Sequence, residues 1–380
     1  MNILSTPIDD GACGLYRVSQ PLKRLENLYN DVRVDFLTAS HSANVVQKAI
    51  EMTDIIVVRQ DKSKFIPHIK EMQMIYAKNG AKLPVKIVFD HDDNLFDVNP
   101  FNDSYRYSGL SEVKMSDVMD ETWMEQHPND KDEYLWKNGR DDFDLKRNQD
   151  GADRLIQNLK NSDMITAPNK KLCALYSMMS GVKKTAVLPN CVDFTHFMKD
   201  VGLKKKGIRV GWQGGSSHFV DYMSIRDDIF RIAEREDATY VHIGQQFQDM
   251  RRIGCADYND WVPTPAHPYR LALMNLDLAV IPLAHFEFNY YKSDIKFVEL
   301  SALKIPSVVA NCEPYSDIVE HGVTGFLYND IKEMDFYLTE LIRNTKLREK
   351  VGQNAFEWCY ENRNADKQAH LWKEAYDLLA

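Results

Sequence analysis

Two series of short apolar runs, each alternating with helical patterns, constrain the fold of this chain more than any other feature. The runs of the first series are Asn2–Ser5, Val32–Thr38, Asp54–Arg59, Lys86–Asp90, Met164–Ala167 and Ala186–Pro189. The helical patterns between them fall at Val18–Tyr29, Asn44–Met52 and Lys64–Lys78. Continuous Val/Ile runs that alternate with helices are typical of a parallel sheet covered on both faces. The sequence therefore predicts an α/β domain over residues 1–192.

The second series predicts another α/β domain, over residues 208–362. Its runs are Ile208–Trp212, Tyr240–Ile243, Leu278–Ile281, Ser307–Ala310 and Phe326–Tyr328. At 380 residues the chain is too long for one typical core, which also favours two domains. Residues 193–207 form the expected linker. We expect two Rossmann-like domains whose parallel sheets face each other across a cleft, with ligands at the carboxyl ends of the strands.

The last helical pattern, over residues 363–380, is amphipathic. One stripe of it carries Trp372, Ala375 and Leu378. Two placements are open for this helix. It either crosses back to pack on the first domain or covers the second domain as a surface helix.

Composition excludes several classes of protein. Hydrophobic residues make up 44% and charged residues 27% of the chain, which is ordinary for a globular protein. No run of 18 apolar residues exists, so we expect no membrane span, and the first residues lack a signal-peptide pattern. The net charge of −9 argues against a large basic surface for nucleic acid. Six cysteines without pairing or metal spacing favour a reducing, cytoplasmic location.

The stretch 292–326 carries the most chemical information. Lys292 and Ser293 open an expected helix, and Glu299 lies about two turns further along. The start of a helix exposes unpaired N–H groups and a partial positive charge, which suits a phosphate. Lys292 and Lys296 add full charges, and Glu299 is placed to bind ribose hydroxyls. The pattern predicts a site for an anionic, sugar-bearing ligand; the alternative is an ordinary helix–strand unit with a surface Lys/Glu pair.

The same stretch resembles the donor-sugar motif of the GT-B glycosyltransferases, in particular the retaining family 4. That family pattern has a pair of glutamates; Glu299 matches the second, whereas Tyr291 stands where the first would be. The Lys-Ser-x-x-Lys-x-x-Glu form of many relatives fits this chain at Lys292, Ser293, Lys296 and Glu299. The resemblance implies a GT-B fold, a nucleotide-diphosphate-sugar donor and retention of configuration at the anomeric carbon.

Glycine-rich loops follow the first strand of each predicted domain. In the second domain, the residues that resemble the family's diphosphate-binding loop are Gly214, Gly215, Ser216 and His218. The resemblance also places Gly244 and Val262 near the nucleotide base. In the first domain, the residues that resemble the family's sugar- and acceptor-facing loop are Gly11, Gly14 and Arg17. Glycines allow close approach of the backbone to a ligand, and ordinary tight or flexible turns are the alternative at both loops.

An acidic element ends the fourth strand of the first domain. Its sequence, Asp90-His91-Asp92-Asp93-Asn94, resembles an Asp-x-Asp-Asp element of the same family. Carboxylates at a strand end that faces a cleft are costly unless they are paired or solvated. We expect Asp92 or Asp93 to bind sugar or acceptor hydroxyls, with Asp90 and His91 beside them. A divalent-metal site and a solvated acidic turn are the alternatives.

Residues 116–154 differ in composition from the rest of the first domain. They hold 12 acidic and 6 basic side chains, a balance of −6, together with several aromatic residues. We interpret this stretch as an insertion with one or two helices. It serves either as a lid or acceptor-recognition element or simply as a solvated face.

Together these features predict a glycosyltransferase that moves a sugar from a nucleotide-diphosphate sugar to a hydroxyl acceptor. Lys292 and Lys296 would stabilise the leaving diphosphate, with Asp92 and Asp93 at the reacting sugar. No cofactor or metal is expected. A nucleotide-sugar epimerase of the same fold and a non-catalytic nucleotide-sugar-binding protein are the alternatives. The acceptor stays open among a glycan, a lipid-linked sugar, a protein and a modified nucleic-acid base.

Overall fold

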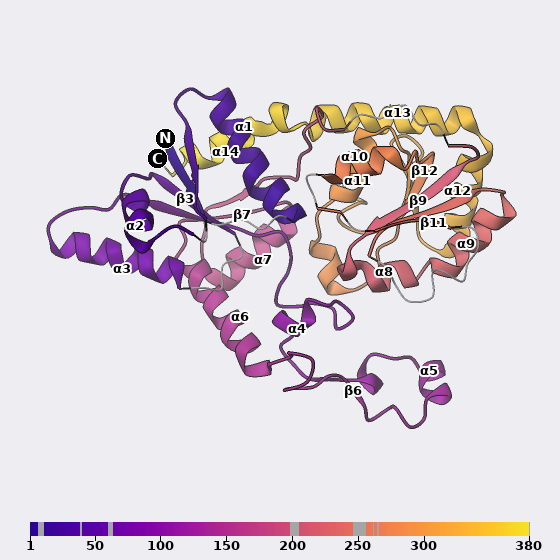
Figure 1. The fold of residues 1–380 in the computed structure, drawn as a ribbon, viewed down its shortest axis with the longest axis horizontal. Helices are drawn as coiled ribbons and strands as arrows, with labels where there is room; N and C mark the ends of the chain where they lie inside the picture. The colour runs from indigo at the N-terminus through magenta and orange to yellow at the C-terminus, as the bar shows by residue number, and fades with distance from the viewer. Residues whose placement is uncertain are drawn as a thin grey trace.

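Two six-stranded parallel sheets form the framework of the molecule (Figure 1). The computed structural model describes residues 1–6, 11–38, 40–59, 64–197, 205–245, 256–260, 262–263 and 266–379. In spatial order, the strands of the first sheet are β2 (Arg33–Phe36), β1 (Asn2–Ser5), β3 (Ile55–Arg59), β4 (Lys86–Asp90), β7 (Met164–Ala167) and β8 (Thr185–Val187). Those of the second sheet are β11 (Ala256–Asp260), β10 (Thr239–Gly244), β9 (Arg209–Gly214), β12 (Leu278–Ile281), β13 (Ser307–Ala310) and β14 (Phe326–Tyr328). The predicted α/β class with two parallel sheets is confirmed.

Helices lie between most successive strands that the structure describes, although turns alone join β13 to β14. In the first half they are the π-helical η1 (Gly14–Ser19), α1 (Gln20–Leu28), α2 (Ala43–Glu51), α3 (Phe65–Lys78), α4 (Tyr105–Ser108), η2 (Met115–Asp117), α5 (Glu121–Gln126), α6 (Leu145–Lys160) and α7 (Lys170–Ser180). In the second half they are η3 (Ser216–His218), α8 (Phe219–Met223), α9 (Arg226–Arg235), α10 (His267–Leu273), η6 (Glu287–Tyr291), α11 (Ile295–Ala302), α12 (Ile331–Arg343) and α13 (Thr345–Asn362). The chain ends with α14 (Ala365–Asp377).

Local sequence explains where several helices begin and end. Asn169 caps α7 because its side-chain oxygen accepts a hydrogen bond from the backbone N–H of Leu172. Gly181 ends that helix in the left-handed conformation, with φ of 78°, which only glycine adopts without strain. Asn344 caps α13 in the same way through the backbone N–H of Leu347. These caps satisfy backbone groups that a helix end leaves unpaired.

Each strand of the first sheet supplies side chains to both of its faces. In β3, Ile56 and Val58 pack with Ile66 and Ile69 of α3, whereas Ile55 and Val57 belong to the cluster on the opposite face. Alternate residues of a strand point to opposite faces, so a strand buried on both sides must be apolar throughout. This requirement is why the inner strand β3 reads Ile-Ile-Val-Val, whereas the edge strand β2 carries exposed Arg33 and Asp35.

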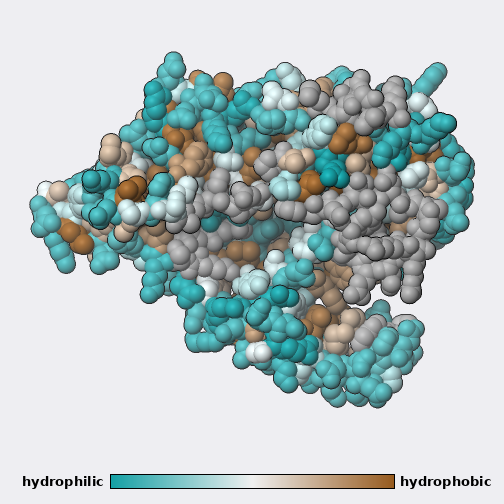
Figure 2. All heavy atoms as spheres, viewed as in Figure 1, coloured by the Kyte–Doolittle hydropathy of each residue, from teal (hydrophilic) through white to brown (hydrophobic). Residues whose placement is uncertain are grey.

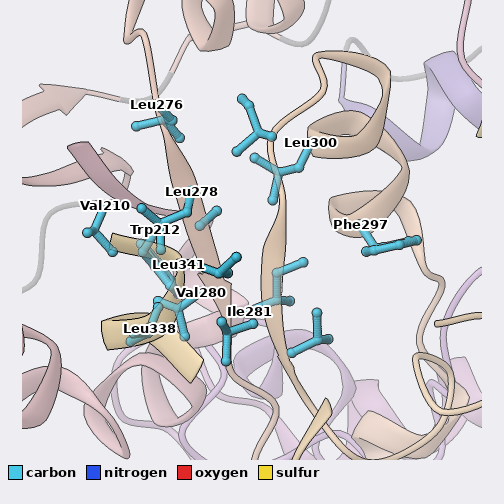
Figure 3. Close-up of a cluster of buried hydrophobic side chains, with 14 of the residues drawn as sticks. Val210, Trp212, Leu276, Leu278, Val280, Ile281, Phe297, Leu300, Leu338 and Leu341 are labelled. Atoms are coloured by element: carbon cyan, nitrogen blue, oxygen red, sulfur yellow. The ribbon is translucent and has the colours of Figure 1, made fainter. Parts of the chain in front are cut away.

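The second sheet has one large core of its own. Figure 3 shows part of it, where side chains of β9 and β12 lie among residues of α11 and α12. Phe297 and Leu300 anchor α11 in this core, and both are buried. The opposite face of α11 is therefore the one that can reach a ligand.

The strand orders identify where ligands should bind. Numbered along its own half of the chain, the first sheet has the order 2-1-3-4-5-6 and the second has the order 3-2-1-4-5-6. Both are doubly wound orders in which the chain reverses direction beside the first strand. The reversal lies between β1 and β3 in the first sheet and between β9 and β12 in the second. Crevices for ligands form at the carboxyl ends of the strands at these points.

Helix α14 packs on the first half of the molecule. Its Trp372, Ala369 and Tyr376 share a buried cluster with Leu22 and Leu25 of α1. The chain therefore passes between the halves twice, near residue 192 and near residue 364. These two passages lie side by side, because Val192 donates a backbone hydrogen bond to Arg363 and accepts one from Ala365. Residues 198–204 of the predicted linker lie outside the described residues.

The predicted insertion, residues 116–154, projects below both sheets in Figure 1. Its β6 (Tyr134–Trp136) pairs antiparallel with β5 (Val113–Lys114). Stacked rings of Tyr105, Trp136 and Phe143 hold its base together. Whether it is a lid, an acceptor-recognition element or a solvated face stays a prediction.

The face of the molecule drawn in Figure 2 is mostly hydrophilic where it is described, with hydrophobic residues in small groups. Among the helices that the structure describes, none has both the length and the apolar character to cross a bilayer.

Candidate active site

A cavity of about 330 Å³ lies where the carboxyl ends of the two sheets meet. Loops after β1 and β4 line it from the first sheet, and loops after β9, β10 and β12 line it from the second. Its volume is in the range of small-molecule sites. The predicted site residues that line it are Gly11, Asp92, Asp93, Gly214, Gly215, His218, Gly244, Val262, Lys292, Ser293, Lys296 and Glu299.

Helix α11 begins at this cavity, but later than the sequence predicts. Its first residue is Ile295, and Asp294 is the N-cap. Lys292 and Ser293 were expected to open the helix; Lys292 is instead in extended backbone, because it ends the preceding 3-10 helix η6. Within the described chain, the backbone N–H groups of Ile295 and Lys296 have no hydrogen-bond acceptor. They are therefore available to an anion in the cavity.

The two lysines at this helix start both have a lowered pKa. Burial and the neighbouring Lys292 lower the pKa of Lys296 to about 7. Burial also lowers the pKa of Lys292, although Asp221 and Asp93 partly offset the effect. The Lys296 ammonium donates to the backbone oxygen of Gln213 at 2.9 Å. A diphosphate placed here would favour the charged form of both lysines.

His218 and Asp221 form a pair that holds Lys292. The Nδ1 atom of His218 lies 2.7 Å from Asp221 and 3.3 Å from the Lys292 ammonium. Burial and the two lysines lower the pKa of His218 to about 3, so the ring is neutral at pH 7. Hydrogen bonds and the nearby cations hold the pKa of Asp221 well below its usual range, despite its burial. Asp221 is therefore the fixed negative charge beside Lys292.

Glu299 is buried, with both carboxylate oxygens engaged. The phenol of Tyr16, from the first half of the chain, donates to Oε1 at 2.7 Å. The side-chain amide of Gln213 donates to Oε2 at 3.2 Å, and His267 lies 3.6 Å from the same oxygen. A carboxylate has about four acceptor sites, so Glu299 retains capacity for hydroxyl donors of a ligand. Side chains from both domains therefore contact Glu299.

Two glycines let the ends of β9 and β10 approach each other. Gly244 has a φ of 118°, and a β-carbon there would lie 2.1 Å from the backbone oxygen of Gly214. No other residue fits at that position, because real β-carbons do not approach backbone oxygen this closely. The two glycines keep this end of the cavity open to a ligand.

The first half of the chain contributes an acidic wall. Asp92 is buried and lies 3.5 Å from the guanidinium of Arg59. Burial and the neighbouring Asp92 raise the pKa of Asp93 to about 7. Burial and Asp92 also raise the pKa of the Cys13 thiol, so Cys13 is not a thiolate at pH 7. This wall can accept hydrogen bonds from hydroxyl groups.

Several predicted site residues do not reach the cavity. Arg17 is buried against Asp90, with hydrogen bonds of 3.0 and 2.6 Å to the two carboxylate oxygens, and it also donates to the backbone oxygen of Leu188. Arg17, which was predicted to lie on the sugar and acceptor side, therefore pairs with Asp90 instead of lining the cavity. His91 is fully buried between the rings of Phe89 and Tyr176. Neither Asp90 nor His91 faces the ligand space.

Gly14 and Ser216 also lie outside the cavity lining. Gly14 is buried at the start of the π-helical turn that leads into α1. Ser216 begins the short 3-10 helix η3, and its neighbours Gly215 and Ser217 line the cavity in its place. Other residues of the two glycine-rich loops therefore line the cavity.

Four further residues of the site were not predicted, because they contact the predicted residues only in the folded protein. Tyr16, Gln213 and His267 surround Glu299, and Asp221 holds Lys292. Tyr16 lies in the first glycine loop and Asp221 follows the second, so position in these loops was the available signal. Gln213 directly precedes Gly214 of the second loop and shares this signal, whereas His267 carried none. Among the described residues, no group of three or more His, Cys, Asp or Glu side chains is placed to hold a metal ion.

Comparison with solved structures identifies the arrangement of the two sheets as the GT-B fold. HepE of Anabaena, in complex with UDP and glucose, matches with a TM-score of 0.59 and 14% identity over all of both chains. Sucrose-phosphate synthase of Thermosynechococcus elongatus matches with a TM-score of 0.60 and 12% identity, over 100% of this chain and 99% of that one. The lipopolysaccharide outer core galactosyltransferase WaaB, in its apo form, gives a TM-score of 0.56 and 13% identity over both full chains. No protein-family model and no curated protein matches the sequence.

Proposed function

We propose that this protein is a glycosyltransferase that moves a sugar from a nucleoside-diphosphate sugar to a hydroxyl group of an acceptor. One observation carries the proposal: Lys292, Lys296 and the unpaired amides that begin α11 converge on a cavity at the switch point of a GT-B sheet, with Glu299 one turn further on. The proposal is supported by structural neighbours of the same fold, one of which binds UDP and glucose.

The diphosphate of the donor would lie at the start of α11. There Lys292 and Lys296 supply charge, Ser293 supplies a hydroxyl donor, and the backbone of Gly214 and Gly215 permits close approach. The ribose hydroxyls would donate to Glu299. The base would occupy the end lined by Gly244 and Val262, as the family resemblance implies.

Transfer breaks the bond between the anomeric carbon and the diphosphate oxygen, and forms a bond to the acceptor oxygen. Negative charge develops on the diphosphate as it leaves, so donors already aimed there lower the barrier. The acceptor hydroxyl loses a proton, which the leaving phosphate oxygen accepts. We propose retention of configuration, as in family 4, with both the departing and the attacking oxygen on one face of the sugar. The two lysines supply the charge that a metal ion would otherwise supply, so no metal is required.

The acceptor would lie against the first-domain wall of Asp92 and Asp93. Buried carboxyl groups there can accept from the sugar or acceptor hydroxyls. The class of acceptor stays open among a glycan, a lipid-linked sugar, a protein and a modified nucleic-acid base. In the described chain the cysteines are free, which favours a reducing compartment such as the cytoplasm.

A ligand panel tests this function first. Thermal unfolding is measured with a series of nucleoside-diphosphate sugars, because a ligand at 100 times its Kd adds about 2.7 kcal/mol of stability. The stabilising donor is then mixed with acceptors of the four classes, and release of nucleoside diphosphate is followed. Conversion of the donor without acceptor would instead identify an epimerase. Binding without release in any mixture would identify a binding protein.

A matched pair of variants tests the site. Glu299→Gln should lower kcat/KM for the donor by about tenfold or more, because a charged acceptor of ribose hydroxyls becomes a weaker neutral one. Glu349→Gln changes an exposed glutamate on α13 and should have no effect. Equal activity of both variants would remove Glu299 from the site.

A further inference from the structure

The segment Glu287–Lys292 belongs to the second domain by sequence, but its side chains pack on the first. Phe288 is 4% exposed and lies in a buried cluster with Val98, Tyr105, Val113 and Phe143. All four of these partners come from the chain between β4 and α6. Tyr291 packs against the core of the first sheet as well. The segment that ends in Lys292 is therefore held partly by the opposite domain.

Asn169 makes the most specific of these contacts. Its side-chain oxygen caps α7 of the first domain by accepting from the backbone N–H of Leu172 at 2.8 Å. Its side-chain nitrogen donates to the backbone oxygens of Tyr291 at 3.0 Å and Lys292 at 3.1 Å. One amide thus fixes a helix of one domain to two consecutive peptide groups of the other.

Lys171, two residues further on, reinforces this contact. Its ammonium lies 4.8 Å and 5.2 Å from the ring centres of Tyr290 and Tyr291, within cation–π range. The same ammonium pairs with Glu313 of the second domain at 2.9 Å. The beginning of α7 therefore contacts this segment through both Asn169 and Lys171.

The other side of the segment contacts the diphosphate site. Asn289 donates to Asp221 at 2.8 Å, and Asp221 lies 3.9 Å from the Lys292 ammonium. His218 completes the group at 3.3 Å from the same ammonium. A displacement of the segment must therefore move Lys292 relative to His218 and Asp221.

We propose that Asn169 is a positioning residue for sugar transfer: it ties the lysine that binds the diphosphate to the first domain, so that the diphosphate site is complete only when the two domains are closed. The inference rests on the proposed function, in which Lys292 binds the diphosphate. Donor binding on one domain and the acceptor wall on the other are coupled through this contact.

Asn169→Asp isolates the contact. Aspartate still caps α7, because its oxygen can accept from Leu172, but it cannot donate to the two backbone oxygens. The matched control is Asn344→Asp, which makes the same change at the N-cap of α13, on an exposed residue outside the cavity. If Asn169→Asp fails to fold, Asn169→Gly replaces it, since glycine is tolerated at an N-cap and has no side-chain donor.

Two measurements distinguish positioning from general weakening. The Kd values for UDP and UMP are compared, and amide hydrogen exchange of residues 287–298 is followed. For Asn169→Asp we expect UDP binding to weaken by about tenfold, UMP binding to change by less than about threefold, and the segment to exchange faster. Asn344→Asp should leave all three unchanged.

An unchanged ratio of the two Kd values, or unchanged exchange in the segment, would overturn the proposal. Equal weakening for both nucleotides would also contradict it, because that result indicates a loss of fold rather than of diphosphate positioning. If the wild-type protein binds a nucleoside diphosphate other than UDP, that diphosphate and its monophosphate replace UDP and UMP. If it binds no nucleoside diphosphate, the proposed function fails. The exchange measurement alone then decides whether Asn169 holds the segment.

Discussion

The two walls of the cavity carry opposite charge, and burial acts on them in opposite senses. On the second-domain wall, burial lowers the pKa of Lys292 and lowers that of Lys296 to about 7. On the first-domain wall, burial raises the pKa of Asp93 to about 7. Lys296 and Asp93, one on each wall, are therefore both poised between their charged and neutral forms near pH 7. A ligand that is anionic at one end and carries neutral hydroxyl groups at the other matches both walls at once.

Each wall also contains a counterion of permanent charge. The basic wall has a permanent internal counterion in Asp221, whose pKa is held far below its usual range. The acidic wall has a permanent cation in Arg59, 3.5 Å from Asp92. Lys296 and Asp93 are the titratable members closest to neutral pH. Changes at these two and at Lys292 should therefore separate the functions of the walls.

The largest effect should come from removing charge on the basic wall. Lys292→Met keeps the length of the side chain but takes away a donor aimed at the leaving diphosphate. We expect kcat to fall by about 10²–10³-fold. Lys332→Met, on an exposed lysine of α12, is the control and should keep full activity. Steady-state transfer assays measure kcat. A wild-type kcat for Lys292→Met would show that the basic wall has no role in catalysis.

A change on the acidic wall should have the opposite effect on donor and acceptor. Asp93→Asn keeps a hydrogen-bonding group but removes a charge that interacts with Lys292. We expect kcat/KM for the acceptor to fall by about tenfold, because hydrogen bonds to charged groups contribute about 1.5–3 kcal/mol. UDP affinity should rise slightly, because a competing negative charge is gone. Calorimetry with UDP and transfer kinetics test both signs, and weaker UDP binding would contradict the division of roles.

The pH dependence of donor binding should follow Lys296. With a pKa of about 7 before binding, Lys296 must take up a proton to bind a diphosphate at higher pH, so affinity should fall as pH rises above 7. The limit for one proton is about tenfold per pH unit. Ionisation of Asp93 near the same pH acts in the same direction. The Kd for UDP is measured between about pH 7.5 and 9, where its phosphates, with a second pKa of about 6, no longer titrate.

Lys296→Met is the matching variant for this profile. It should bind UDP more weakly at pH 7.5 but lose most of the slope with pH. A slope equal to that of the wild type would assign the proton to another group.

The smallest effect should come from the contact that joins the walls. Tyr16→Phe removes the hydrogen bond to Glu299 without changing shape. We expect donor KM to rise by about three- to tenfold, since a typical hydrogen bond contributes about 1 kcal/mol net and Gln213 still donates to the carboxylate. Tyr269→Phe, at an exposed tyrosine of α10, is the control. An unchanged KM would show that Glu299 does not need the first domain.

Much of the fold could be predicted because parallel strands buried on both faces must be apolar. The predicted bounds of β12, β13 and β14 agree with the structure residue for residue. β11 (Ala256–Asp260) was missed because its sequence, Ala-Asp-Tyr-Asn-Asp, has no apolar run; it pairs only with β10, at the edge of the sheet. β6 was missed because it is a very short strand, with two aromatic residues, in an otherwise charged stretch. Its pairing with β5 therefore has no local signal in the sequence.

The site was less predictable, because sequence position does not show what a side chain meets. Lys292 and Glu299 could be placed in the cavity because both belong to one local helix pattern. Arg17 and Asp90 were assigned to the cleft because each lies beside a strand end, but they are opposite charges that meet and pair inside the protein. Tyr16 reaches Glu299 only because the two domains close on each other. Pairs that form across the domain boundary carry no local signature.

The chain crosses between the domains at Val192 and again at Asn364, and the two crossings lie side by side. The connection is therefore a hinge rather than a flexible linker. Two adjacent, hydrogen-bonded segments of chain favour rotation of one domain relative to the other about that edge. In Figure 1 the α13–α14 junction lies at the top edge and the insertion at the bottom. Rotation about the top edge would separate the domains most at the bottom, beside the insertion, and Phe288 would then leave its buried cluster.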